Sequence, residues 1–358
     1  MDILVPDSAA ATIDAHPINT LRAASAISEA LAQKLAAEHY GLIAAVHRLD
    51  SERDQNFRLR SPSGREYVLK IASPTEDRAV TNLQTEALLH LAATDPELPV
   101  PRIFPARNGM TELDIAFDDG STRVVRLLSF LPGTPMHAVT ASATLRRDLG
   151  RCAARLARGL SEFSHCGANH KLLWDLQHAA EVRPLIDAVP GERRGLVEDI
   201  IGGFETRALP MLPQLPTQPV HNDLNPHNIV VDPESHSCVA GIIDFGDLTR
   251  TARINDLAIA AAYLVADSDD PLGPACEMIA AYHALLPLAS AELGILPDLI
   301  VTRMAVTVVI SSWRAARYPA NRNYILRNNA AAWARLQRMA KLSQDLARAQ
   351  IERACDGG

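Results

Sequence analysis

The spacing of apolar positions changes several times in the first third of the chain. Residues 20–37 are rich in alanine and carry apolar side chains at helical spacing, which predicts a helix. Residues 42–49, 56–60 and 67–72 instead have the short, β-branched and alternating character of strands. The last two segments flank the turn-forming Ser-Pro-Ser-Gly at residues 61–64, so they should form a hairpin.

A second helix and two further strands follow this hairpin. The helix should open at Pro74, present Leu88 among the apolar residues of one face, and end near Asp95. Strands are expected around Ile103 and at residues 124–130. This order of strands, helix and strands predicts a small antiparallel sheet with a helix packed on it.

Helical spacing dominates the remainder of the chain. The segment Ser-Phe-Leu-Pro-Gly-Thr-Pro at residues 129–135 has the proline and glycine content of a linker. Helices are predicted at residues 145–163 and 195–209 and again through the C-terminal part, interrupted by short strands at 229–231 and 239–244. We therefore predict a sheet-rich N-terminal lobe and a larger helical C-terminal lobe.

Composition and charge restrict the class of protein. The 358 residues are 47% hydrophobic and 22% charged, which is ordinary for a globular chain with room for two lobes. We assign residues 1–19 to a leader, 20–130 to an N-terminal nucleotide-binding lobe and 131–358 to a C-terminal catalytic and substrate lobe. The net charge of −7 disfavours a nucleic-acid partner, because such binding requires a clustered basic face.

Cysteine usage and hydropathy bear on the compartment. The five cysteines are widely scattered, with no spacing typical of a disulfide framework or a zinc site. The leader lacks the basic start and apolar run of a secretory signal. No stretch approaches the ~20 uninterrupted apolar residues of a membrane span. We expect a cytoplasmic protein with no membrane partner, and we leave its oligomeric state open.

The strongest chemical signal is His-Asn-Asp-Leu-Asn-Pro-His-Asn at residues 221–228. It matches the kinase catalytic loop H-R-D-L-x-x-x-N at every fixed position except the arginine. In such a loop a carboxylate accepts the proton of the attacking hydroxyl and an amide oxygen reaches a metal on the phosphates, which assigns these roles to Asp223 and Asn228. Further on, Asp244-Phe-Gly ends an apolar strand and supplies a second hard oxygen ligand for Mg²⁺.

A lysine in the N-terminal lobe completes the chemistry of a kinase. Lys70 stands among apolar neighbours in the predicted strand Tyr-Val-Leu-Lys-Ile, where an unpaired ammonium would be costly. We expect Lys70 to contact the nucleotide phosphates with Glu86, on the following helix, as its partner, and Glu76 on the same predicted helix is the alternative. Ser51 and Arg53 lie in the preceding turn, which contains no glycine; they are candidates for contacting phosphate, and a solvated polar turn is the competing interpretation.

The segment after Asp244 indicates the size of the acceptor. A protein kinase carries a long activation segment and an A-P-E motif at this point. Here a helix is predicted to begin at Asp256, so little chain remains to hold a peptide. We therefore expect the phosphoryl acceptor to be a small molecule.

These motifs resemble the aminoglycoside phosphotransferase and choline kinase superfamily, and within it the hydroxylysine kinases. The resemblance covers most of residues 40–340. The stretches that carry it are residues 54–57, 67–71, 125–133, 221–228 and 241–248. Asn222 departs from the glycine usual at that position, and asparagine tolerates the left-handed backbone that glycine would adopt there.

The resemblance implies an α+β, bilobal protein-kinase-like fold with ATP or GTP as the phosphoryl donor and Mg²⁺ as cofactor. It implies Asp223 as catalytic base, Asn228 and Asp244 as metal ligands, and Lys70 as the phosphate-binding lysine. The backbone near Phe130 and Leu131 should meet the nucleotide base. The implied acceptor is an amine-bearing alcohol, with 5-hydroxylysine favoured.

The residues that bind the acceptor are less distinct. Asp247 and Asp175 are candidates for a substrate ammonium, and Trp174 would add cation–π attraction or belong to the core. Arg322 or Arg126 would suit a substrate carboxylate, although structural roles are favoured for both.

Three alternatives remain at this point. The acceptor could be homoserine, an aminoglycoside or another amino alcohol. The chain could be a non-catalytic nucleotide-binding module of kinase fold, although such modules typically lack one of the three acidic or amide groups found here. It could also be a metal-dependent hydrolase that uses His221, Asp223 and His227 as ligands.

Overall fold

The computed structural model describes residues 26–51 and 53–357, so the predicted leader at residues 1–19 lies outside the described residues. The chain forms two compact units. The N-terminal unit extends to Pro96 and adds Val100–Pro132 and His165–Gly167; the C-terminal unit holds Glu97–Pro99, Gly133–Ser164 and the chain from Ala168 onward. The main crossing lies between Pro132 and Gly133, where the sequence placed a boundary between residues 130 and 131.

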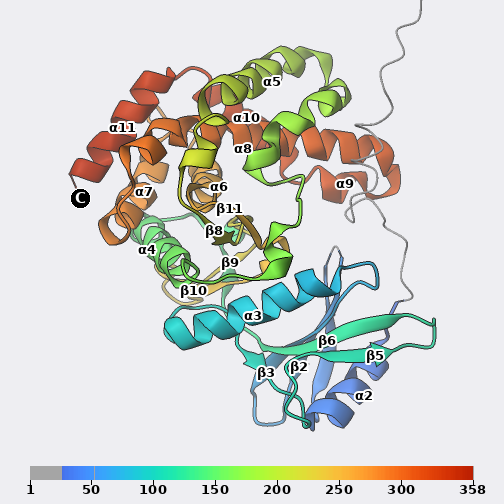
Figure 1. Cartoon of the computed structure of the whole chain (residues 1–358). Helices are drawn as coiled ribbons and strands as arrows, with labels where there is room; N and C mark the ends of the chain where they lie inside the picture. The colour runs from blue at the N-terminus through green and yellow to red at the C-terminus, as the bar shows by residue number, and fades with distance from the viewer. Residues whose placement is uncertain (1–25, 52, 358) are drawn as a thin grey trace, which may run out of the picture. The chain divides into compact units, whose positions relative to one another are not determined.

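The N-terminal unit contains an antiparallel sheet of order β1-β2-β3-β6-β4, with β5 also paired to β6 (Figure 1). The strands are β1 (Ala45–Leu49), β2 (Gln55–Arg60), β3 (Glu66–Ile71), β4 (Ile103–Phe104), β5 (Leu113–Ala116) and β6 (Thr122–Ser129). The predicted hairpin is present, with Lys70 opposite Asn56 in its register. The sequence reading missed β5, whose four residues Leu-Asp-Ile-Ala are too few for a clear alternation.

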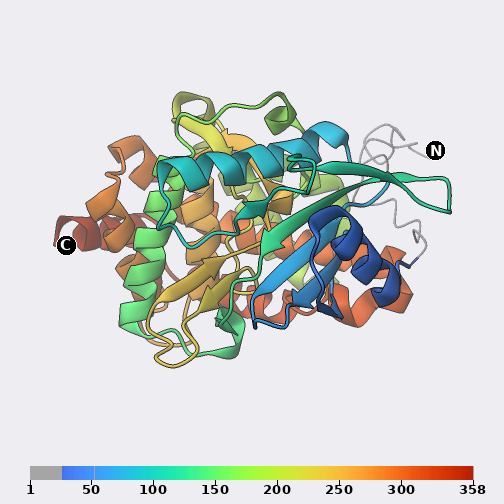
Figure 2. The same ribbon diagram turned by 90° about the horizontal axis from the view of Figure 1, so that it is seen from below.

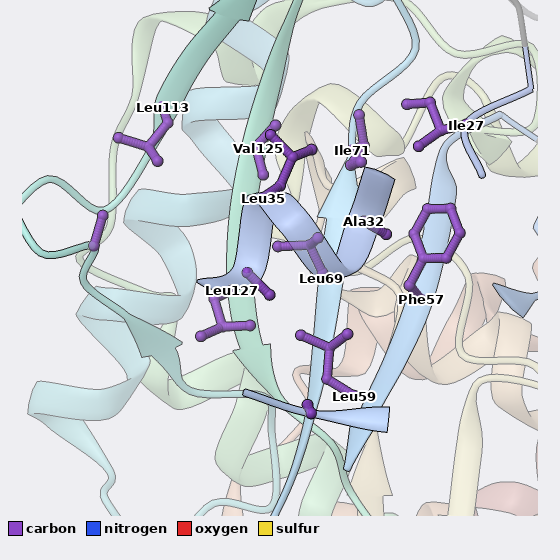
Figure 3. Close-up of a cluster of buried hydrophobic side chains, with 13 residues drawn as sticks. Ile27, Ala32, Leu35, Phe57, Leu59, Leu69, Ile71, Leu113, Val125 and Leu127 are labelled. Atoms are coloured by element: carbon purple, nitrogen blue, oxygen red, sulfur yellow. The ribbon is translucent and has the colours of Figure 1, made fainter. Parts of the chain in front are cut away.

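Helix α2 (Glu29–Tyr40) covers one face of this sheet and α3 (Arg78–Thr94) the other (Figure 2). Ala32 and Leu35 of α2 pack onto Leu69 and Val125, in a cluster of buried apolar side chains (Figure 3). Successive side chains of a strand point to opposite faces, so the residues between these apolar positions face α3. Alternation therefore places Lys70 and Arg126 on the α3 side.

The ends of both helices follow local side-chain chemistry. Ser28 caps α2 by accepting a hydrogen bond from the Leu31 amide, and Gly41 ends it in the left-handed conformation at φ 68°. Helix α3 begins after Asp77, whose carboxylate accepts from the Ala79 amide at 2.7 Å. The predicted start at Pro74 was therefore too early, because the capping carboxylate marks the first helical turn.

The C-terminal unit is mainly helical, as predicted. Its α-helices are α4 (Ala143–Gly159), α5 (Gly191–Gly203), α6 (Ile254–Leu264), α7 (Gly273–Leu285), α8 (Ser290–Arg317), α9 (Arg322–Ile325), α10 (Asn329–Met339) and α11 (Gln344–Asp356). Its shorter helical segments are η2 (Met136–Ala138), η4 (Leu176–Ala188), η5 (Phe204–Ala208), η6 (Leu212–Gln214), η7 (Phe245–Asp247) and η8 (Pro319–Asn321), and η3 (Cys166–Asn169) contains residues of both units. Helices α6 and α10 both pack against α8 (Figure 1).

Helix α8 bears on the expectation that no segment is long and apolar enough to span a membrane. Ser290–Arg317 is long and apolar enough to cross a membrane by length and composition. Of its most apolar window, 89% is buried inside the fold, which is the position of a core helix. Its hydropathy is therefore explained by packing within this unit.

Short strands of the C-terminal unit bring two loops together. Strands β9 (Ile229–Val231) and β10 (Val239–Ile242) pair with each other, with β7 (Thr134–Pro135) beside β9. Strands β8 (Thr217–Val220) and β11 (Thr249–Ala252) form a second pair, which the sequence reading missed. Residues 221–228 join β8 to β9 and residues 243–248 join β10 to β11. Because both connections run between the same two strand pairs, they lie side by side.

Candidate active site

The loop at residues 221–228 is held by a buried carboxylate from α6. Asp256 accepts hydrogen bonds from the backbone amides of His221 at 2.9 Å and of Asn222 at 2.6 Å. Asn222 has φ 63°, so asparagine occupies the left-handed conformation anticipated from the glycine usual there. The sequence marked Asp256 only as the start of a helix, and its role depends on a contact that no local pattern reveals.

His221 ties this loop to the one that carries Asp244. Its Nε2 lies 3.0 Å from the Ile243 carbonyl, and the Ile243 amide donates to the Asn228 carbonyl at 2.9 Å. Its Nδ1 accepts from the Asp223 amide at 3.3 Å. Both ring nitrogens therefore serve the backbone of the two loops, which fixes Asp223, Asn228 and Asp244 within one region.

Asp223 is surrounded by donors. Its Oδ2 accepts from the side-chain amides of Asn225 and Asn228, each at 2.8 Å, and its Oδ1 accepts from Nη2 of Arg303 at 3.0 Å. A carboxylate offers about four lone-pair positions. Three are used by these contacts, so a position on Oδ1 remains for a substrate hydroxyl. The side chain of Asp223 is 24% exposed, which leaves it accessible to an acceptor.

Opposing charges act on this carboxyl. Burial raises the pKa of Asp223 above its ordinary value, the Arg303 guanidinium lowers it, and the Asp247 carboxylate raises it again. Arg303 is therefore the cation that opposes the effect of burial on the pKa of Asp223.

The oxygen donors fit a magnesium ion. The amide nitrogen of Asn228 is directed to Asp223, which turns its carbonyl oxygen away from that carboxylate. Asp244 is exposed, adopts φ 63°, and accepts from the Gly246 amide at 3.2 Å. Within the described residues, no three His, Cys, Asp or Glu side chains form a metal-binding group. Mg²⁺ commonly takes one or two protein oxygens and completes its shell with phosphates and water, so an amide and a carboxylate suit it.

That result weighs against a metal-dependent hydrolase. His221 uses both nitrogens on the backbone, as described above. His227 stacks on His137 with ring centroids 4.1 Å apart and lies 3.3 Å from the side-chain oxygen of Asn328. The trio His221, Asp223 and His227 is not a metal-binding group among the residues that the structure describes.

Arg303 was missed in the sequence reading. It lies in the middle of α8, is 4% exposed, and its second contact is a hydrogen bond to the Trp174 carbonyl at 3.0 Å. A signal was present: an arginine alone in the run Ile-Val-Thr-Arg-Met-Ala-Val needs a partner for the same reason as Lys70. The partner, Asp223, is remote in sequence and only the packing of α8 identifies it.

Two of the acceptor candidates need correction. Asp175 is fully buried and its carboxylate accepts from the Gln177 amide at 3.0 Å, the Gln177 side chain at 2.6 Å and the Thr251 hydroxyl at 3.0 Å. It caps the helix Leu176–Ala188, so the prediction that it binds a substrate ammonium is wrong. The cation beside the half-buried Trp174 ring is Arg303, with Cζ 5.7 Å from the ring centroid. Asp247 is half-buried near Asp223 and remains a candidate.

In the N-terminal unit, Lys70 has a different partner from the one predicted. Its Nζ lies 3.1 Å from Oδ2 of Asp54, and both side chains are 13% exposed. Glu86 is exposed on α3, whereas Gln84 and Thr85 of the same turn contact Arg126 on the sheet. Successive helical residues are rotated by about 100°, so Glu86 is turned away from the sheet when its neighbours face it. Asp54 can reach Lys70 because it immediately precedes β2, the strand that pairs with β3.

The other predicted nucleotide contacts lie at the ends of strands. Ser51 is exposed and Arg53 half-buried in the turn between β1 and β2. The Phe130 amide donates to the Glu66 carbonyl at 3.3 Å and its ring lies 4.1 Å from the Arg58 guanidinium, while Leu131 is half-buried. Their contacts with a nucleotide remain predictions.

The two arginines considered for a substrate carboxylate also differ in environment. Arg126 is 1% exposed and donates to Gln84 and to the Thr81 carbonyl beneath α3. This is a structural role, as favoured from the sequence. Arg322 is exposed on α9.

Comparison with known proteins agrees with this geometry. A model of the phosphotransferase enzyme family (APH) matches residues 22–293. The chain belongs to this family, and the two units have its bilobal kinase-like fold. It is a small-molecule kinase, a phosphotransferase that acts on hydroxyl groups with a nucleotide as donor.

Individual proteins and solved structures are also similar to this chain. The hydroxylysine kinase of Xenopus laevis is 30% identical over 342 residues, covering 89% of this chain and 91% of that protein. The hydroxylysine kinase of Mus musculus is 27% identical and covers 88% and 90%. Among solved structures, a microcompartment-associated aminopropanol kinase aligns with a TM-score of 0.69 at 18% identity, covering 89% of this chain and 99% of that one. An amicoumacin kinase in complex with AMP-PNP and Ca²⁺ aligns with a TM-score of 0.63 at 15% identity, covering 89% and 95%. These two structures support the fold.

Proposed function

We propose that this kinase transfers the terminal phosphoryl group of ATP or GTP to the hydroxyl of 5-hydroxylysine. The observation that carries the reaction is the environment of Asp223, in which three donors leave a position on Oδ1 for an incoming hydroxyl. The choice of acceptor rests on the identity of about a third with hydroxylysine kinases over nearly their whole length.

Each residue has a defined part in this scheme. Asp223 receives the proton of the acceptor hydroxyl on Oδ1 while the hydroxyl oxygen bonds to the terminal phosphorus, whose bond to the bridging oxygen breaks so that the nucleoside diphosphate leaves. Arg303 keeps the carboxylate ionised and oriented. Asn228 and Asp244 would hold Mg²⁺, which neutralises charge on the phosphates when bound. Lys70 binds nucleotide phosphate, and its pairing with Asp54 holds the side chain in place before binding.

Asp247 is the proposed ligand for the ammonium of the acceptor. Its carboxylate is close enough to Asp223 to affect the pKa of that residue. A protonated amine placed between them would reduce their mutual repulsion, so amine-bearing alcohols should bind better than neutral ones.

The test is release of nucleoside diphosphate, measured with ATP and with GTP against 5-hydroxylysine, homoserine, amino alcohols and aminoglycosides. We expect 5-hydroxylysine to give the highest kcat/KM. Asp223→Asn should bind nucleotide nearly as well as the wild type and lose turnover by roughly 10²–10⁴-fold. Wild-type rates in this variant would refute the assignment of the base, and a higher kcat/KM for another acceptor would refute 5-hydroxylysine.

Nucleotide binding without turnover against the whole panel would instead favour the non-catalytic module. The variant Asp244→Asn tests the metal site independently of turnover. It should weaken the dependence of nucleotide binding on Mg²⁺, measured by calorimetry, in either a catalytic or a non-catalytic protein.

A further inference from the structure

One arginine near the catalytic residues has an unusual environment. Arg335 lies on α10, one helical turn from the buried residues Ala332 and Met339, so it points toward the packed side of the helix. It is half-buried, and burial lowers the pKa of its guanidinium. Within residues 26–51 and 53–357, no carboxylate lies within 4.0 Å of it.

Several other half-buried arginines of the C-terminal unit have acidic partners. Arg338, one turn further along the same helix, lies 2.6 Å from Asp267, and Arg253 lies 2.7 Å from Glu292. A guanidinium removed from water without an anion is costly, and proteins usually supply one. Arg335 differs from these arginines, and its guanidinium could be paired by an anion that comes from outside the chain.

The position of Arg335 connects it to the catalytic base through two side chains. Its Cζ is 5.8 Å from the ring centroid of Tyr263 on α6. Tyr263 also neighbours the Arg303 guanidinium, which binds Asp223. Helices α6 and α10 both pack against α8, so this series of contacts lies within one packed group of helices (Figure 1).

We propose that Arg335 binds the carboxylate of an amino-acid acceptor and so determines the preference of the enzyme for hydroxylated amino acids. This inference rests on the proposed function and names the residue that separates amino acids from amino alcohols. The guanidinium provides two parallel donors for a carboxylate. Because Arg303 and Tyr263 lie between Arg335 and Asp223, the acceptor needs several carbons between its hydroxyl and its carboxylate, as 5-hydroxylysine has.

The experiment compares Arg335→Met with the wild type on matched acceptors. The acceptors are 5-hydroxylysine and 1,5-diaminopentan-2-ol, which has the same chain and no carboxylate; homoserine with 3-aminopropan-1-ol is a second pair. We expect the variant to raise the KM for 5-hydroxylysine by roughly ten- to hundredfold, the effect of losing a charged hydrogen bond. The KM for the diamine and the KM for the nucleotide should not change.

Two further variants make the result specific. Arg338→Met removes an arginine of the same helix that already has an acidic partner, and it should leave both KM values near those of the wild type. Arg335→Lys keeps the charge and should recover part of the affinity for 5-hydroxylysine. Thermal denaturation of each variant shows whether the fold is retained.

The outcomes separate this inference from the proposed function. Equal losses on both members of a pair, no loss on either, or a raised nucleotide KM would overturn the role of Arg335 even if 5-hydroxylysine is the substrate. If the wild type prefers homoserine and Arg335→Met loses homoserine alone, 5-hydroxylysine and the argument from chain length are both wrong, and only the contact between Arg335 and the carboxylate stands. If the wild type accepts only alcohols without a carboxylate, both are wrong.

Discussion

Removing the guanidinium of Arg303 should raise the pKa of Asp223 and so shift the pH dependence of the reaction to higher pH. Arg303 Nη2 and Asp223 Oδ1 are 3.0 Å apart, with side chains 4% and 24% exposed. Two unit charges at this separation attract by roughly 5.5 kcal/mol at an effective dielectric constant of about 20 and by roughly 1.4 kcal/mol in bulk water. At about 1.36 kcal/mol for each pKa unit, Arg303→Met should raise the pKa of Asp223 by roughly one to four units.

The sign of the effect follows from the protonation state that the reaction needs. Asp223 accepts a proton and so must be ionised, which means that activity is lost as pH falls through its pKa. A higher pKa moves this acidic limb of the kcat profile to higher pH, so Arg303→Met should be weakly active near pH 7 and should recover activity in alkali.

The assay is kcat against pH for the wild type, Arg303→Met and Arg303→Lys. The lysine variant keeps a cation and should have an acidic limb between those of the other two enzymes. A uniform loss of kcat in Arg303→Met, with the acidic limb unmoved, would show that Arg303 acts only through packing and would refute the electrostatic reasoning.

Three other expectations concern the rest of the site. Lys70→Ala should raise the nucleotide KM roughly ten- to hundredfold, whereas Glu86→Gln should leave it unchanged in the same assay; an equal effect of both would restore Glu86 as a partner. Asp256→Asn replaces the acceptor of two loop amides and should lower the free energy of unfolding by about 2 kcal/mol in urea titration, with a change under 0.5 kcal/mol, about the effect of a surface substitution, counting against it. The pKa of His227 is lowered by burial, by His137 and by Arg327, so the unfolded chain takes up a proton first. Stability should therefore fall as pH drops below about 6.5, and His227→Gln should reduce this loss in thermal melts; an unchanged pH dependence would contradict it.

Local patterns in the sequence predicted most of the N-terminal elements and singled out the loop at residues 221–228. Alternating apolar positions identified the hairpin that carries Lys70, because the side-chain period of a strand is set by its own backbone. The motif at residues 221–228 singled out Asp223 and Asn228 as the predicted base and metal ligand, because such a pair must keep a fixed separation along one loop. The backbone of Asn222 was also anticipated, since left-handed conformation is a property of the residue type.

Tertiary packing decided which side chains meet. The partner of Lys70 is Asp54 and not Glu86, because the rotation of α3 turns Glu86 to solvent. Asp175 is chemically suited to an ammonium, yet its burial against Gln177 and Thr251 makes it a helix cap.

The cation beside Asp223 is the clearest case of this division. The sequence places Arg303 within an apolar run, a signal that the sequence analysis missed. Which acid it meets depends on how α8 packs beside the loop at residues 221–228, and that is decided by the burial of many apolar side chains together. A sequence pattern records what each residue needs, whereas packing of distant segments determines which residue supplies it.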